Sequence, residues 1–470
     1  MKINPPKAII GKEDPFEHTL FRRKEFAESL TNLLRNVEEN LVIFVNAPWG
    51  EGKTTFAEMW KTQLEKRDHL NVIYFDAYAA DYFDDPFVSF SGEILEFADK
   101  HLPDGKKLKE RREFKKTAVE VGKRLAGLAV KVGIRAATLN AFDEKHEGEL
   151  KKIGDELVTG VSEISADVIE KKIEKYGEEK DALRAFKKSL EKLADKVQEN
   201  QKFPLTIIVD ELDRCRPDFA LGLLERIKHL FDVKGVAFVL LVNRNQIENY
   251  IRTVYGGSDA ESYLLKFGSL FIDLPNQGSA SNSQEYQKGV KEYCHSLVSH
   301  YGFPAQTVDT HFFATSMGIF ANHFGLTLRE IEKAFTVAAI YFSSSTPDRF
   351  SNRSENVWLI ALLSILKIKT PLIYSSLSKQ TFTLDRFYQD TKLDRLNFRG
   401  EQQFNWDYLN ALLEFYLMSD AELEKAAKGE GEKNGYLRQI TSRGSWTQAN
   451  RNNVILNHCS SLDRFSVKPQ

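Results

Sequence analysis

The sequence contains few cysteines, and this scarcity limits what the chain can be. Its cysteines, Cys215, Cys294 and Cys459, are too few and too far apart for a disulfide framework or a cysteine metal motif. This usage is typical of the reducing cytoplasm, where we expect the protein to act. Residues 1–6 lack the apolar core of a secretion signal.

Long apolar runs are also absent. No stretch approaches the roughly 20 apolar residues of a membrane-spanning helix. The most apolar helical candidate, residues 125–142, is interrupted by Lys131 and Arg135. We therefore predict no membrane span and interpret this stretch as an amphipathic or partner-binding helix. The formal net charge of −2 gives no overall attraction to nucleic acid or to an anionic surface.

A glycine-rich segment follows a short apolar run near the start of the chain. Residues 41–45 have the composition of a buried strand, and residues 47–54 read Ala-Pro-Trp-Gly-Glu-Gly-Lys-Thr. A strand that leads through such a loop into a helix holds nucleotide phosphates against backbone N–H groups. The alternative is a strand, turn and helix that share this pattern by chance.

Each residue type in this loop suits a phosphate site. Gly50 and Gly52 carry no Cβ and let backbone N–H groups turn inward. We expect Lys53 to reach the β- and γ-phosphates and Thr54 to bind Mg²⁺ through its hydroxyl. Ala47 stands where the common pattern has its first glycine, so this corner must be built differently or not need a glycine. The candidate nucleotide-binding residues are Trp49, Gly50, Glu51, Gly52, Lys53, Thr54 and Thr55.

A second apolar run ends in acids. Residues 205–209 read Leu-Thr-Ile-Ile-Val, and Asp210 and Glu211 follow directly. Paired carboxylates at the end of a buried strand suit a magnesium nucleotide. We predict that Asp210 binds the metal, through a water, and that Glu211 orients and deprotonates the attacking water. Alone this pattern is weak, because exposed strand ends often carry acids. Together with the upstream loop it predicts an NTPase.

The two motifs together resemble those of the KAP family of P-loop NTPases, which are AAA-like ATPases. The resemblance rests on a tryptophan inside the phosphate loop, Trp49, and on Asp-Glu-Leu-Asp-Arg-Cys at residues 210–215. It covers most of residues 14–276 apart from a long insertion, and it includes Tyr-Leu-Leu-Lys at residues 263–266. Beyond this region it touches residues 320–340 weakly.

This resemblance implies an α/β core with a parallel sheet and a site for ATP and Mg²⁺. Tyr78 stands where the family commonly has tryptophan, and Asn243 where it commonly has aspartate. We therefore expect Asn243 to be a polar sensor of the γ-phosphate or the water. Arg329, early in a predicted helix, is similar to the lid arginine that reaches the γ-phosphate in AAA-like and KAP-like ATPases. The alternative for Arg329 is a surface arginine beside two glutamates.

An arginine from a neighbouring subunit completes many such sites, where it stabilises charge on the transferring phosphoryl group. Arg214 and Arg216, just past the acids, are candidates, with Arg244 and Lys266 behind them. Each arginine can equally be a structural partner of nearby acids such as Asp213.

The strand patterns stop and restart along the chain, which predicts its organisation. The 470 residues, 42% of them apolar, allow roughly two to four domains. We predict an insertion formed as a hairpin of long helices projecting from the sheet, because its apolar residues recur at helical spacing. These residues include Leu183, Phe186, Leu190, Leu193 and Val197. The predicted parts are a P-loop core in two pieces, 1–98 and 203–276, the helical insertion 99–202 between them, a helical lid 277–345 and a helical C-terminal interaction module 346–470.

The start of the insertion is basic. One interpretation is a contact with phosphates of nucleic acid or of anionic lipid. The other, which we favour, is a solvated helix face balanced by acids further along, because aromatic residues that could stack on bases are scarce there. The basic residues are Lys106, Lys107, Lys109, Arg111, Arg112, Lys115, Lys116, Lys123 and Arg124.

We therefore predict a Mg²⁺-dependent ATPase that turns over slowly and acts as a conformational switch or assembly factor. ATP is favoured over GTP by the resemblance and because the guanine-reading pattern Asn-Lys-x-Asp is missing; residues 242–245 read Val-Asn-Arg-Asn. The setting that the resemblance implies is bacterial anti-phage defence, with self-association and effector proteins as partners and nucleic acid not required. Two alternatives stay open, a nucleic-acid-stimulated motor and a nucleotide-binding scaffold with little hydrolysis.

Overall fold

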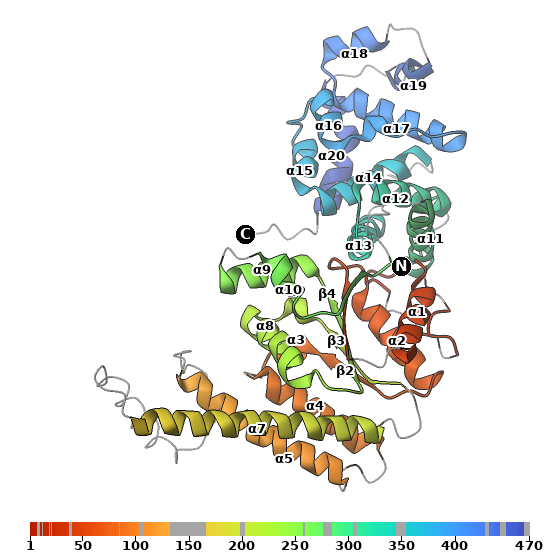
Figure 1. Cartoon of the computed structure of the whole chain (residues 1–470). Coiled ribbons are helices and arrows are strands. Elements are labelled where there is room, and N and C mark those ends of the chain that lie inside the picture. The colour runs from red at the N-terminus through yellow and green to blue at the C-terminus, as the bar shows by residue number, and fades with distance from the viewer. Residues whose placement is uncertain are drawn as a thin grey trace. The chain divides into compact units, whose positions relative to one another are not determined.

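The computed structural model divides the chain into two compact units (Figure 1). The sheet unit comprises Ile10–Pro48 and Lys53–Pro275, and the helical unit comprises Met1–Ile9, Trp49–Gly52 and Asn276–Gln470. The structure describes residues 1–6, 10–11, 13–17, 19, 21–36, 40–83, 85–102, 105, 108–131, 166–197, 203–256, 259–275, 284–303, 308–344, 354–427, 432–441 and 448–464.

The sheet unit is built on five parallel strands. Their order in space is β2-β3-β4-β1-β5, so β4 separates the strand before the glycine loop from the strand that ends in acids. Parallel strands place their carboxyl ends at one edge, and Asp76 at the end of β2 is level with Asp210 at the end of β3. The predicted parallel α/β core is confirmed. The strands are β1 (Leu41–Asn46), β2 (Val72–Asp76), β3 (Leu205–Asp210), β4 (Val236–Val242) and β5 (Leu270–Asp273).

The strands are apolar because both faces of the sheet are covered. Every residue of β3 and β4 is buried, as expected for central strands with helices on both sides. Along β1, alternate residues enter different cores, since successive side chains point to opposite faces. Val42 and Phe44 join one core, and Ile43 and Val45 join the other, which α1 (Arg23–Asn36) and α2 (Lys53–Lys66) line.

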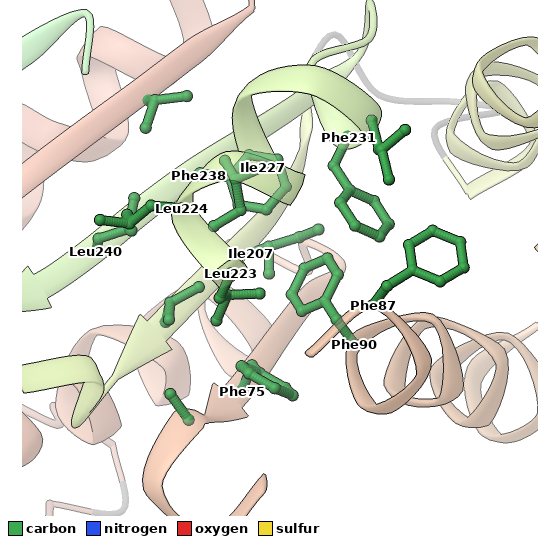
Figure 2. Packing of buried hydrophobic residues seen from close by; sticks show 14 of the residues in the cluster. Phe75, Phe87, Phe90, Ile207, Leu223, Leu224, Ile227, Phe231, Phe238 and Leu240 are labelled. Atoms are coloured by element: carbon green, nitrogen blue, oxygen red, sulfur yellow. The ribbon is translucent and has the colours of Figure 1, made fainter. Parts of the chain in front are cut away.

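The first of these cores is rich in phenylalanine (Figure 2). Phe90 of helix α4 packs edge-to-face on Phe75 of β2 and on Phe231, with ring centroids 5.1 and 4.7 Å apart. Burying a side chain of this size contributes about 1.5–3 kcal/mol. The helices beside this face include α4 (Pro86–His101), α8 (Pro217–Arg226) and the π-helical turn η4 (Ile227–Phe231).

The insertion joins this phenylalanine core. Its helices α5 (Lys109–Lys131) and α7 (Ala166–Val197) lie side by side (Figure 1). Phe186 of α7 is fully buried, 5.2 Å from the ring of Phe87 and 5.3 Å from that of Phe114. These two helices therefore pack against the rest of the sheet unit around Phe186. Lys106, Lys107 and residues 132–142 of the predicted amphipathic helix lie outside the described residues.

None of the described helices combines the length and apolar character that crossing a membrane requires.

The helical unit surrounds α14, which is nearly continuous in apolar residues and buried along most of its described length. Helix α13 begins with a reciprocal cap. Thr327 N–H donates to Glu330 Oε2 at 2.8 Å, and Glu330 N–H donates to Thr327 Oγ1 at 3.3 Å. The main helices are α11 (Gln284–Tyr301), α12 (Thr310–Phe324), α13 (Leu328–Ser344), α14 (Ser354–Lys369), α15 (Pro371–Ser378), α16 (Leu384–Thr391), α17 (Glu401–Leu417), α18 (Asp420–Ala427), α19 (Glu432–Thr441) and α20 (Gln448–Asp463).

Candidate functional site

The glycine loop leaves the carboxyl end of β1 and enters α2 at Lys53. Ala47 continues the strand, since its N–H donates to the Val242 carbonyl at 3.0 Å, and it is not among the residues with positive φ. An alanine is therefore unstrained at this corner. Gly50 and Gly52 have φ values of +90° and +76°, which side chains with a Cβ adopt only at a cost.

Gly50 also packs closely within the helical unit. Its carbonyl accepts the Arg329 N–H at 3.1 Å, and a Cβ at this position would lie 2.8 Å from the Arg329 Cβ. Burial raises the pKa of the half-buried carboxyl of Glu332, and the positive charge of Arg329, whose side chain is exposed, lowers it. Glu330 is held instead by Lys369, with 3.0 Å between Nζ and Oε2.

Lys53 is folded against the protein. Its side chain is only 8% exposed, and Nζ lies 2.8 Å from the Ala47 carbonyl oxygen and 3.2 Å from Asp213 Oδ2. The next residue, Thr54, directs its hydroxyl toward Glu211, with 3.4 Å between Oγ1 and Oε1. The first turn of α2 is thereby connected to both carboxylates that follow the metal candidate Asp210.

Asp210 is completely buried at the end of β3 and is held at both oxygens. Oδ1 accepts the Glu211 N–H at 2.8 Å, and Oδ2 accepts the Tyr74 hydroxyl at 2.9 Å. Burial raises the pKa of the Asp210 carboxyl, while hydrogen bonds from Thr54 and Tyr74 act in the opposite direction. Sequence reasoning missed Tyr74, whose role depends on the pairing of β2 with β3.

Glu211 has a left-handed backbone with a φ of 59°, which is strained for a residue with a side chain. Its carboxylate is engaged by Arg214, with Nη1 and Oε1 2.8 Å apart. Burial raises the pKa of Glu211, and the charge of Arg214 opposes that rise. The candidate base Glu211 therefore lies directly after the carboxyl end of β3 and is already paired with Arg214.

The other cations considered for the site have partners within the same unit. Arg216 Nε is 3.0 Å from Asp81, and Arg244 Nε is 2.8 Å from Glu248. Lys266 lies over the ring of Tyr263, 4.8 Å from its centroid. Arg216 and Arg244 therefore each have a structural acid partner, Asp81 and Glu248 respectively.

Asn243 follows β4 and begins α9 (Arg244–Tyr255). Its N–H donates to Asp213 Oδ2 at 2.8 Å, so the candidate sensor and Lys53 share one carboxylate. The sequence motif contains Asp213, but nothing in its spacing reveals this connection, because Lys53 and Asn243 come from distant parts of the chain.

The cysteine and histidine pairs have ordinary surroundings. Cys215 is buried, and burial raises the pKa of its thiol, which disfavours the reactive thiolate. His458 Nδ1 lies 2.6 Å from the Tyr341 hydroxyl, and burial lowers its pKa to about 4. In the part of the chain that the structure describes, no group of three or more His, Cys, Asp or Glu side chains is placed to hold a metal ion alone.

Comparisons with known proteins identify the family. No curated protein matches the chain. A solved structure titled as the Aeropyrum pernix ORC2 protein in ADPNP–ADP complexes is similar over 95% of this chain and 96% of its own, at 13% identity and a TM-score of 0.35, a likeness too low to support an inference. The model of the KAP family P-loop domain matches residues 23–335, more than half of the sequence, and the chain belongs to this family.

Proposed function

We propose that this protein is a Mg²⁺-dependent ATPase whose cycle serves as a conformational switch. One observation carries the proposal. At the carboxyl edge of a parallel sheet, the lysine and threonine that begin α2 face the carboxylates that follow β3, with 3.2 Å between Lys53 and Asp213 and 3.4 Å between Thr54 and Glu211. Ligands of parallel α/β sheets bind at this edge.

The loop would hold the nucleotide phosphates. Glycines with positive φ at positions 50 and 52 turn the backbone so that N–H groups can face an anion. The amino terminus of α2 adds a partial positive charge at the same place. Lys53 would supply the full charge for the β- and γ-phosphates. Trp49, next to Gly50 in the loop, is 45% exposed.

The donors present fit magnesium. The Thr54 hydroxyl and the Asp210 carboxylate are hard oxygen donors, which Mg²⁺ prefers, and ATP phosphates and waters can complete its octahedron. Thr54 directly, and Asp210 through a water, would therefore be sufficient protein ligands for a nucleotide-bound ion. Bound there, Mg²⁺ would neutralise charge that develops on the phosphates.

Glu211 would accept a proton from the attacking water as the water oxygen bonds to the γ-phosphorus and the bond to ADP breaks. Its raised pKa makes the carboxylate a better proton acceptor than an exposed glutamate. The ion pair with Arg214 competes for the same oxygen. Slow turnover in the isolated protein, and acceleration once a partner or second subunit draws Arg214 away, are consistent with a switch.

The biological setting that we propose is bacterial anti-phage defence, in which the ATPase associates with itself and with effector proteins. This part rests on the resemblance of the motifs to those of bacterial KAP-like ATPases.

The test is phosphate release by wild type, Lys53→Ala and Glu211→Gln, with and without DNA or RNA. Lys66→Ala and Glu65→Gln are matched controls, because they remove the same charges at the carboxyl end of α2, away from the loop. We expect turnover in wild type and both controls, none in the two site variants, and indifference to nucleic acid. Strong stimulation by DNA or RNA would favour a motor, and nucleotide binding without any turnover would favour a scaffold.

A further inference from the structure

One buried carboxylate connects three elements of the sheet unit. Asp213 lies in η3 (Leu212–Arg214), the short turn after β3, and is 1% exposed. Its Oδ2 accepts the N–H of Asn243 at 2.8 Å and lies 3.2 Å from the ammonium of Lys53. Its own carbonyl accepts the hydroxyl of Tyr250, in α9, at 2.9 Å.

A nucleotide phosphate would have to compete with Asp213 for the ammonium of Lys53. A buried ammonium and a buried carboxylate each lose hydration, and each depends on the other to offset that loss. Lys53 is also held by the carbonyls of Ala47 and Pro48, at 2.8 and 3.4 Å. A phosphate that takes up the ammonium must therefore draw it from a position in which it is already well satisfied.

We propose that Asp213 is the resident counter-ion of Lys53 in the empty site, that it lowers the affinity for nucleotide, and that it transmits occupancy to the Asn243 segment. When the ammonium turns to a phosphate, Oδ2 loses its cation but stays buried. Its bond to the Asn243 N–H must then strengthen or rearrange. This inference rests on the proposed function, because it requires nucleotide at the glycine loop.

The direction in which one substitution changes nucleotide affinity separates this role from a purely structural one. Asp213→Asn is nearly isosteric and keeps an oxygen that can accept the Asn243 N–H, but it removes the charge that holds Lys53. We expect it to tighten the binding of ADP and of a non-hydrolysable ATP analogue by about fivefold or more, measured by titration calorimetry. Asp218→Asn, which removes an exposed acid a few residues on, is the matched control and should leave affinity unchanged.

A double-mutant cycle excludes simple charge repulsion. If Asp213 acts through Lys53, then adding Asp213→Asn to Lys53→Ala should change ADP affinity by less than about twofold. If Asp213 merely repels phosphates, the full tightening should persist without Lys53. That persistence, or an Asp213→Asn protein that binds no tighter than wild type, would overturn the proposal.

A further measurement needs no variant. Hydrogen exchange of the peptide that contains Asn243 should change when ADP binds to wild type, and an unchanged rate in the nucleotide-saturated protein would overturn the transmission to this segment. In these failures wild type still binds nucleotide. Failure of the proposed function would appear instead in the phosphate-release test, or as a wild type that binds no nucleotide.

Discussion

Replacing Tyr74 by phenylalanine removes one hydroxyl and tests whether the Asp210 carboxylate is held ready for a metal. In the pairing of β2 with β3, Tyr74 is level with Ile208, and Asp210 lies two residues further along on the same face. The long tyrosine side chain therefore reaches Asp210 along the sheet, at 2.9 Å from Oδ2.

The size of the effect follows from this contact. A hydrogen bond to a charged group contributes about 1.5–3 kcal/mol, and 1.4 kcal/mol is a factor of ten. We therefore expect Tyr74→Phe to raise the Mg²⁺ concentration for half-maximal ATPase activity by about 10- to 100-fold, the range seen when residues that support metal ligands are removed. The bond also lowers the pKa of Asp210, so its loss should weaken metal binding more at acidic than at alkaline pH.

The assay is a Mg²⁺ titration of phosphate release, with ADP affinity in EDTA as a metal-free reference. Tyr78→Phe is the matched control, because Tyr78 is 54% exposed on the short helix after β2. A Tyr74→Phe protein with wild-type Mg²⁺ dependence would refute the reasoning. Equal losses with and without Mg²⁺ would also refute it, since they would mean general damage to the nucleotide site.

The remaining predictions concern the loop, the acids and the arginine. Gly50→Ala should abolish nucleotide binding and lower the free energy of unfolding by about 1–2 kcal/mol, because φ is +90° and the new Cβ would lie 2.8 Å from the Arg329 Cβ in α13. Gly92→Ala is the control and should be tolerated, since a Cβ there would have nothing within 4 Å. Nucleotide titrations and melting curves check both variants. Burial raises the pKa of Asp210, so the folded state binds the proton more tightly than the unfolded state. The stability that this carboxyl contributes therefore falls as pH rises through its folded pKa. In melting curves without Mg²⁺, the melting temperature of Asp210→Asn should rise relative to that of wild type between about pH 4 and 7. Arg214→Ala should raise the turnover of the isolated protein if the arginine restrains the base, with Arg184→Ala, at an exposed ion pair of the insertion, as control. A fall in turnover that is restored by mixing with a Glu211→Gln protein would show action in trans.

The parts of the site that could be predicted are those that depend on residues close together in the sequence. A glycine loop after an apolar run and a pair of acids after another follow from composition and spacing, and the parallel sheet follows from their combination. The helices around Phe186 follow from apolar periodicity, but their packing against Phe87 does not, because periodicity gives the buried face of a helix without its partner.

What could not be predicted depends on strand order and register. Tyr74 reaches Asp210 only because β2 pairs with β3. Asp213 reaches Lys53 only because the strand order places β3, the first strand after the insertion, one strand away from β1, with β4 between them. Ala47 is instructive in the opposite direction. Its departure from the glycine pattern left two alternatives, a corner built differently or one that needs no glycine. The structure has the second, because Ala47 extends β1 by one more hydrogen bond in a conformation that alanine adopts without strain.

The turn after β3 holds both ion pairs that the proposed reaction must break. Asp213 engages the lysine needed for phosphate binding, and Arg214 engages the glutamate needed for hydrolysis. Because these partners are adjacent in a three-residue 3₁₀ turn, the proposed movement of Asp213 on nucleotide binding would be transmitted through the same short backbone to Arg214. Binding would then loosen the restraint on Glu211 without removing it, and a partner or second subunit could draw Arg214 away more easily. A protein arranged in this way would turn over slowly until nucleotide and a partner act together on this turn, which is the behaviour required of a switch rather than of a continuously cycling motor.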